Sequence, residues 1–243
     1  MEQPILSVEG VDKHFGGLMA VSSLSFDVQA GEILGLMGPN GAGKSTTFNL
    51  IAGEYRPDAG TIRYNGDDIT GFSPHKVCHL GIARTYQIPQ PFIKLTALEN
   101  LLVAARFGRG LKAEAAKHEA NELLELVGLS DKRDVCAGEL PVLSLKKLEL
   151  ARALASDPKL VLLDEVAAGT TEEEIPDILG VIEKIREMGK TVILVEHIMK
   201  VIMRAVDRLI VMDKGARIAE GLPSEIMEDR KVIEAYFGEF VET

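Results

Sequence analysis

The chain has 243 residues and carries a formal net charge of −10 at pH 7, from 37 acidic and 27 basic residues. Such a surface repels polyanions, which argues against broad nucleic-acid binding and requires any phosphate site to be local and built from main-chain amides. Hydrophobic residues make up 46% of the chain, an ordinary globular composition, and no apolar run approaches the roughly 18 residues of a membrane-spanning helix.

The first part of the chain predicts short strands. Residues 5–16 (ILSVEGVDKHFG) and 20–38 (AVSSLSFDVQAGEILGLMG) are typical of strands punctuated by glycine. Residues 60–71 (GTIRYNGDDITG) predict a hairpin whose turn is Asn65-Gly66-Asp67.

A glycine-rich segment follows the apolar run 33–37. Residues 38–45 (GPNGAGKS) fit G-x-x-x-x-G-K-[ST] at every fixed position, and residues 45–52 can follow as a helix, which is the context that this motif requires. Successive N–H groups there form a nest for anionic oxygens, and the helix N-terminus favours negative charge. We therefore predict a nucleoside triphosphate site made of Gly38, Pro39, Asn40, Gly41, Ala42, Gly43, Lys44, Ser45 and Thr46.

Three side chains of this motif have separate expected roles. Lys44 should reach the β- and γ-phosphates, and Ser45 should bind Mg²⁺. Thr46 can add a hydroxyl contact to the α-phosphate.

From residue 92 to residue 157 the pattern changes to helices. Residues 111–129 contain strong helix formers and clustered leucines, with Gly128 as a stop. Residues 139–158 carry apolar residues at helical spacing and end at a proline. This block predicts an inserted helical subdomain.

Strand and helix then alternate. Residues 159–166 (KLVLLDEV), 191–197 (TVILVEH) and 208–215 (RLIVMDKG) predict buried strands. Residues 172–190 predict a helix with an acidic start, which Gly189 ends. Strands covered by helices on both sides indicate a mostly parallel α/β sheet.

A carboxylate pair ends the first of these strands. Asp164 stands where a Mg²⁺-binding aspartate belongs, and Glu165 follows at the carboxyl end of the sheet, where ligands bind. A carboxylate there can polarise an attacking water. The alternative is an acidic pair that merely ends a strand.

Missing motifs help to decide how the nucleotide is used. The sequence lacks the Asn-Lys-x-Asp tetrapeptide with which a GTPase switch reads guanine, and nothing marks the acceptor pocket of a small-molecule kinase. A water-activating glutamate beside a metal-binding aspartate favours hydrolysis. We therefore favour an ATPase, with a P-loop kinase as the alternative.

Over essentially its whole length, the chain resembles the nucleotide-binding subunit of an ATP-binding cassette (ABC) transporter. The resemblance rests on GPNGAGKST (Walker A), LLDE (Walker B), GIARTYQIPQPF with LTALENLLVA (the Q-loop region), VILVEH (the switch strand) and VDKHFGG. It implies that Glu165 is the general base and that Gln87 senses Mg²⁺ and the γ-phosphate. It also implies that His197 contacts the γ-phosphate and positions the water, and that Phe15 stacks on adenine.

The same resemblance implies the fold and the division of the chain. The expected fold class is α/β, a P-loop NTPase (RecA-like) mostly parallel sheet with an N-terminal antiparallel β subdomain and an inserted helical subdomain. Residues 1–91 and 158–243 would form the catalytic core with the antiparallel subdomain, and residues 92–157 the helical subdomain. Mg²⁺ would be bound by Ser45, Gln87 and Asp164.

Three sequence segments resemble one subgroup of this family more specifically. RTYQIPQPF, VEHIMKVIM and the tail at 217–239 are similar to the ATPases of high-affinity branched-chain amino-acid importers, although urea, amide and lipopolysaccharide systems share parts of this wording. The resemblance implies a motor subunit that pairs with a second ATP-binding subunit, probably a different chain, and drives a membrane permease served by a periplasmic or extracellular solute receptor. Residues 87–100 would be the permease docking surface. A soluble ABC ATPase of repair or translation is the less favoured alternative.

Two further observations bear on location. The first residues lack the pattern of a secretion signal, and Cys78 and Cys136 have no metal-ligand spacing, which fits a reducing cytoplasm. We expect a peripheral subunit at the cytoplasmic face of the cell membrane.

The family's signature sequence, Leu-Ser-Gly-Gly-Gln, is degenerate here. In the register set by LELARALA, residues 140–144 are Leu-Pro-Val-Leu-Ser, so the serine hydroxyl and both glycines are missing. Pro141 suits a first helical position but has no N–H, and Val142 and Leu143 would keep a backbone from closing onto phosphate. An alternative register, LSLKK at 143–147, lies three residues too near the ARALA segment.

Two interpretations of this break stay open. In one, amides of the first helical turn suffice for docking. In the other, the chain pairs with a different ATPase and the two nucleotide sites are unequal. Val166 in place of the family's proline, and Thr170 and Thr171 in the D-loop, put communication between the sites in further doubt.

Overall fold

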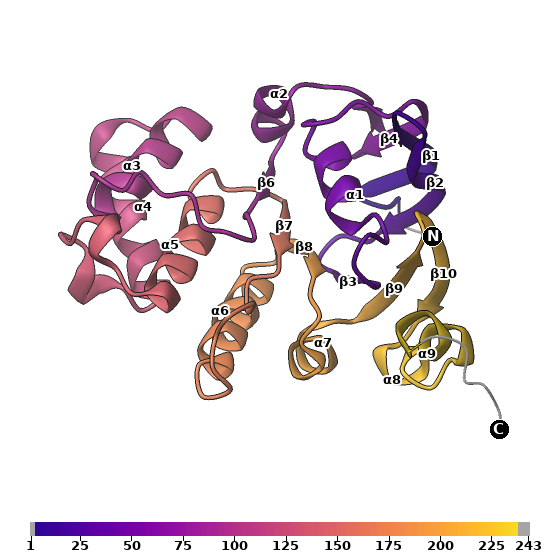
Figure 1. The fold of residues 1–243 in the computed structure, drawn as a ribbon. Coiled ribbons are helices and arrows are strands. Elements are labelled where there is room, and N and C mark those ends of the chain that lie inside the picture. Colours follow the sequence, from indigo (N-terminus) through magenta and orange to yellow (C-terminus); the bar gives the residue numbers. More distant parts are fainter. Residues whose placement is uncertain (1–2, 238–243) are drawn as a thin grey trace. The chain divides into compact units, whose positions relative to one another are not determined.

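The computed structural model describes residues 3–237, which fall into two compact units. The first unit joins the chain up to Val77 to the chain from Thr191 onward, and the second comprises Cys78–Lys190. Figure 1 follows the chain through them from indigo to yellow. The helical block expected over residues 92–157 lies within the second unit.

An antiparallel sheet opens the first unit, with the strand order β2-β1-β4-β5. Its strands are β1 (Leu6–Phe15), β2 (Leu18–Val28), β4 (Ala59–Tyr64) and β5 (Asp67–Asp68). Asn65 and Gly66 join β4 to β5 with positive φ values of 50° and 85°, the conformation that a two-residue hairpin turn needs. The predicted hairpin is confirmed, although Asp67 already pairs with Tyr64 and is not part of the turn.

The other strands of the first unit run in the order β10-β9-β3-β8. They are β3 (Ile33–Met37), β8 (Thr191–Val195), β9 (Arg208–Asp213) and β10 (Ala216–Gly221). β3 is parallel to both β8 and β9, and β10 returns antiparallel to β9. Every residue of β3 and β8 is buried, as the continuous apolar runs predict. The helices are α1 (Lys44–Ile51), α7 (Met199–Ala205), α8 (Pro223–Ile226) and α9 (Arg230–Phe237), and α2 (Pro74–His79) spans the division between the units.

In the second unit β6 (Ile82–Arg84) pairs in parallel with β7 (Leu160–Asp164). The helices are α3 (Ala97–Gly108), α4 (Ala113–Leu126), α5 (Val142–Leu154) and α6 (Ile175–Glu187), with short 3₁₀ turns at Ser130–Lys132 and Ala137–Glu139. Figure 1 shows α3, α4 and α5 gathered into one group. No helix within residues 3–237 is long and apolar enough to cross a membrane.

The ends of these helices test the sequence signals. Gly128 and Gly189 follow α4 and α6 with φ values of 70° and 69°, so both predicted stops are confirmed. The expected place of Pro141 at the first helical position is wrong by one residue. Pro141 is the N-cap of α5, with ψ at 157°, and the helix begins at Val142.

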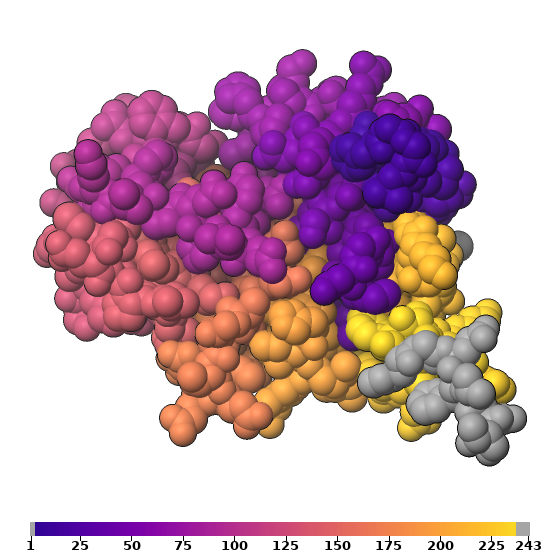
Figure 2. Space-filling model, viewed as in Figure 1, coloured from indigo at the N-terminus to yellow at the C-terminus, as the bar shows by residue number. Residues whose placement is uncertain are grey.

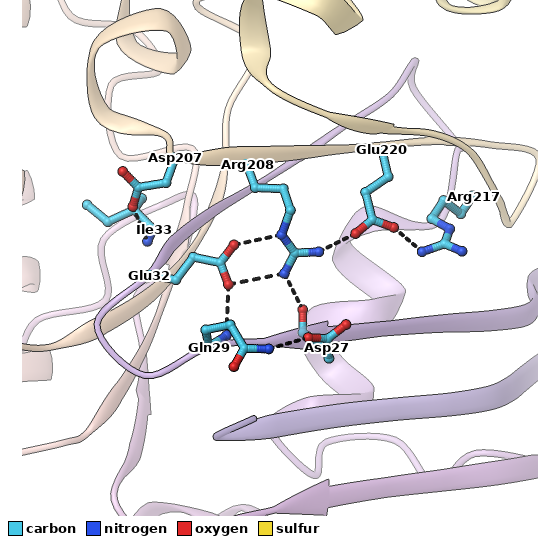
Figure 3. A network of polar contacts seen from close by, with 8 residues as sticks. All are labelled: Asp27, Gln29, Glu32, Ile33, Asp207, Arg208, Arg217 and Glu220. Carbon is cyan, nitrogen blue, oxygen red and sulfur yellow. Dashed lines mark hydrogen bonds and ion pairs between the residues drawn. The ribbon is translucent and has the colours of Figure 1, made fainter. Parts of the chain in front are cut away.

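Arg208 is the centre of a polar network in the first unit (Figure 3). Its guanidinium binds the Glu32 carboxylate through two nitrogens, at 2.7 Å and 3.1 Å, and donates to the carbonyl of Asp27 at 2.6 Å. It also pairs with Glu220, which pairs in turn with Arg217. The hydrogen bonds with Glu32 raise the pKa of Arg208 above its already high ordinary value. The network ties β9 to the end of β2, the start of β3 and β10.

We predict that Arg208→Met lowers the free energy of unfolding by about 2–3 kcal/mol, because it leaves the 10%-exposed Glu32 side chain without its charged partner. Urea denaturation of the full chain measures this loss. Arg230→Met is the matched control, since Arg230 is 85% exposed and pairs with Glu234 on the surface of α9. Equal losses in the two variants would show that the network adds nothing beyond a surface ion pair.

Candidate active site

The glycine-rich loop has the strand-loop-helix context that the motif requires: β3 ends at Met37 and α1 begins at Lys44. Gly38 and Gly43 have φ values of 150° and 104°. A Cβ at Gly38 would lie 2.2 Å from the carbonyl oxygen of Met212, and one at Gly43 would lie 2.5 Å from that of Ala20. No side chain fits at either position, so the backbone is held in its curve by the strands beside it.

Lys44 folds back over this loop. Its ammonium donates hydrogen bonds to the carbonyls of Gly38 at 2.7 Å and Pro39 at 3.1 Å, which places the positive charge across the loop's amides. Ser45 is exposed at the start of α1, whereas the Thr47 hydroxyl is buried and donates to the Gly43 carbonyl at 3.0 Å. The first helical turn therefore presents Ser45 outward and Thr47 inward.

Phe15, at the end of β1, is 42% exposed. Its ring packs edge-on against Tyr55 with centroids 5.2 Å apart, and the Lys13 ammonium lies 5.6 Å from the ring centroid. Tyr55 was not predicted from the sequence, because no motif marks it. An aromatic ring held in place and partly exposed is suited to stacking.

His197 lies two residues after the end of β8 and is exposed. Its main-chain N–H donates to the carboxylate of Glu196 at 3.2 Å, and Glu196 is almost fully buried. The end of this strand thus places one polar side chain inward and the next outward.

The C-terminal helix α9 also reaches the phosphate loop. The main-chain N–H of Gly38 donates to the hydroxyl of Tyr236, and partial burial raises the pKa of that tyrosine. Figure 2 shows the yellow C-terminal segment beside violet residues of the N-terminal part of the chain. Nothing local in the sequence predicts this contact.

In the second unit, β7 ends at Asp164, which is buried. Its main-chain N–H donates to the hydroxyl of Thr85 at 3.0 Å, and its carboxylate lies 3.6 Å from the guanidinium of Arg84. Arg84, which the sequence did not single out, also lies 4.5 Å from the ring centroid of Tyr86. Asp164 thus lies at the end of a buried strand, as predicted, with hydrogen-bonding and guanidinium neighbours.

The structure brings two candidate catalytic residues together. The side-chain amide of Gln87 donates to the carboxylate of Glu165 at 2.6 Å. Glu165 has a φ of 47°, a left-handed conformation uncommon for a residue with a side chain. Its carboxylate is therefore aimed by a special backbone turn and held by Gln87.

The start of α5 carries the degenerate signature. Val142 is 62% exposed at the first turn, while Ser144 is buried and its hydroxyl accepts a hydrogen bond from Lys132 at 3.0 Å. Ser144 is also the serine of the alternative LSLKK register. Its burial argues against that register, because the hydroxyl is used inside the unit.

In the segment after Glu165, the residues that depart from the family sequence are buried or hydrogen-bonded to neighbouring residues. Val166 is buried, the Thr170 hydroxyl donates to the carbonyl of Ala167 at 2.7 Å, and the Thr171 N–H donates to Glu174 at 2.8 Å. These departures from the family wording are compatible with an ordered turn.

The donor types fit a magnesium ion that arrives with a nucleotide. Within residues 3–237 no three or more His, Cys, Asp or Glu side chains are grouped to hold a metal by themselves. Mg²⁺ characteristically takes one or two protein ligands together with phosphate oxygens and water. The hydroxyl of Ser45 and the carboxylate of Asp164 are ligands of the required kind.

Comparisons with known proteins agree with this geometry. The sequence model of the ABC transporter family matches residues 21–168, and that of the branched-chain amino acid ATP-binding cassette transporters matches residues 216–242. The high-affinity branched-chain amino acid transport ATP-binding protein BraF of Pseudomonas aeruginosa is 39% identical over 98% of this chain and 100% of its own length. The probable branched-chain amino acid transport ATP-binding protein LivG of Archaeoglobus fulgidus is 38% identical over 96% of this chain and 95% of its own.

Solved structures agree on the fold. A nucleotide-free ATP-binding cassette from an ABC transporter has a TM-score of 0.88 at 33% identity, and it covers 98% of this chain and 100% of the other. The ADP conformation of an ATP-binding cassette has a TM-score of 0.88 at 34% identity with the same coverage. The predicted α/β P-loop fold class is confirmed. A family match over more than half of the chain, together with full-length relatives above 30% identity, shows that this chain belongs to the ABC transporter family, as an ATP-binding cassette.

Proposed function

We propose that this chain is the ATP-hydrolysing motor subunit of an ABC importer for branched-chain amino acids. The observation that carries the proposal is the phosphate loop, in which neighbouring strands exclude side chains at Gly38 and Gly43 and Lys44 lies across the main chain. The match of residues 216–242 and the names of the relatives favour branched-chain amino acids over urea, amides or lipopolysaccharide as the transported solute.

In the first unit, loop amides would bind phosphate oxygens and Lys44 would neutralise their charge. Ser45 would be a ligand of Mg²⁺, which when bound supplies further positive charge at the phosphates. Phe15 would stack on the adenine ring, with Tyr55 holding its edge. These roles account for binding.

In the second unit, Glu165 would take the proton of the attacking water, and Gln87 would hold the Glu165 carboxylate in place. Asp164 would bind Mg²⁺ through its carboxylate, and the side chain of Gln87 would be a further Mg²⁺ ligand. His197 of the first unit would contact the γ-phosphate. Binding and hydrolysis would thus depend on different residues.

The proposed partners follow from family membership. Two ATP-binding subunits would close on two nucleotides and drive a membrane permease, with the chain peripheral at the cytoplasmic face and a solute receptor acting through the permease. Residues 87–100 would dock the permease. The lack of a signature hydroxyl at the start of α5 favours a different chain as the second subunit.

Lys44→Ala should weaken MgATP binding about 10- to 100-fold, because one charge-assisted contact is lost. Calorimetric titration of the full chain measures the dissociation constant. Lys76→Ala is the control, since Lys76 is an exposed lysine on α2 that lies over the ring of Phe72. If both variants bound MgATP as the unaltered chain does, the phosphate loop would not be the binding site.

Glu165→Gln should reduce phosphate release at least about 100-fold while MgATP binding persists, because a general base contributes on that scale and an amide cannot accept the proton. Turnover is followed as inorganic phosphate formed per chain. Glu172→Gln makes the same change at an exposed position seven residues further along and should leave turnover unaltered. Undiminished hydrolysis by the Glu165 variant would remove it from the role of base.

Phe15→Ala should weaken ATP binding about 5- to 150-fold, the range that stacking on a base supports. Inorganic tripolyphosphate, which has no base, should bind the variant and the unaltered chain equally. Phe15→Tyr keeps the ring and should retain ATP affinity. Parallel loss of affinity for ATP and tripolyphosphate would mean that Phe15 supports the fold and does not recognise adenine.

A further inference from the structure

Three charged residues of α5 lie three positions apart and so share one face of the helix: Lys146, Glu149 and Arg152. Lys146 and Glu149 are only 6% and 5% exposed. Charged groups are seldom buried in this way unless specific hydrogen bonds hold them. Their partners lie on both sides of the Gln87–Glu165 pair.

Lys146 holds the Glu165 side of the pair. Its ammonium donates to the carbonyl of Val166 at 3.1 Å and approaches the carbonyl of Glu165 at 3.5 Å. These are the carbonyls of the turn in which Glu165 has its left-handed conformation. A fixed positive charge at this turn favours the backbone conformation that aims the Glu165 carboxylate.

Glu149 and Arg152 hold the Gln87 side. The Glu149 carboxylate accepts hydrogen bonds from the main-chain N–H groups of Gln90 and Tyr86, on either side of Gln87. Arg152 donates to the carbonyl of Gln90 at 2.6 Å and pairs with Glu149 at 3.0 Å. The loop that carries Gln87 is therefore fastened to α5 at two points.

We propose that Lys146, Glu149 and Arg152 are positioning residues that hold Gln87 and Glu165 in the geometry required for hydrolysis. The inference rests on the proposed roles of Gln87 and Glu165. The face of α5 that carries these three residues fixes the relative position of Gln87 and Glu165, although the start of the same helix lacks the signature residues. The three residues would act through the pair.

The experiment compares two adjacent lysines of α5. Lys146→Met removes the charge that holds the Glu165 turn, whereas Lys147→Met breaks a 2.6 Å ion pair with Asp177 of α6 and leaves that turn alone. In the full chain, Lys146→Met should lower kcat about tenfold or more, since small misplacement of reacting groups has effects of this size. The dissociation constant for MgATP should change less than about twofold, because the phosphate loop is untouched. Lys147→Met should keep the original kcat, and Lys146→Arg should restore most of it.

A second measurement needs no catalysis. Glu149→Gln leaves at least one of the two loop N–H groups without its carboxylate acceptor, so amide hydrogen exchange over residues 86–92 should become about tenfold faster. Lys147→Met should not change this exchange. If Lys146→Met fails to fold, Arg152→Lys, which keeps the charge but loses the forked donor, provides the kcat comparison.

The outcomes separate this inference from the proposed function. Unaltered exchange in Glu149→Gln, or the same kcat in Lys146→Met and Lys147→Met, overturns the positioning role. The positioning role is also overturned if Lys146→Met lowers kcat and MgATP affinity by the same factor and Lys146→Arg does not restore kcat. An unaltered chain without hydrolysis would overturn the proposed ATPase function, while faster exchange would still support the link between α5 and the loop.

Discussion

The close approach of the phosphate loop to its neighbouring strands is the constraint on which the site depends. Carbonyl oxygens of Met212 and Ala20 lie where side chains of Gly38 and Gly43 would be, so these two positions admit only hydrogen. The loop is thus shaped from outside by β9 and β2 as well as by its own composition. Phosphate binding by main-chain amides needs such a fixed curve, because each amide contributes only when it points inward.

The second unit contains buried ionisable side chains, whose burial costs free energy unless they have partners. Asp164, Lys146 and Glu149 are all nearly inaccessible, and each has a charged or main-chain partner. Burying these charges makes their geometry strict, since a misplaced partner would leave a charge uncompensated. The unit therefore has specific polar contacts around Gln87 and Glu165, whereas Pro141 and Val142 at the start of α5 are exposed.

Features encoded by neighbouring residues were predictable. The loop at 38–45, the turn at Asn65-Gly66 and the glycine stops after α4 and α6 each depend on a short stretch of backbone, and each lies where the sequence placed it. Asp164 was found because a buried strand precedes it. These signals need no knowledge of the tertiary structure.

Contacts between distant segments were not predictable in this way. Arg84 contacts Asp164, and Arg152 of α5 contacts the loop that carries Gln87. Both contacts join residues far apart in the sequence, so the spacing of residues gave no signal. The three-residue strand β6 is too short for its alternation to be recognised. Pro141 was misplaced by one position because a proline is compatible with both the N-cap and the first turn.

The hydrogen bond between Gly38 and Tyr236 has an evolutionary consequence. The donor is a peptide N–H, which any residue except proline supplies, while the acceptor belongs to a tail that matches one branch of the family. A substitution in that tail alone can therefore alter a main-chain contact of the glycine-rich loop. Divergence of kinetic properties between branches then requires no mutation in the segment itself.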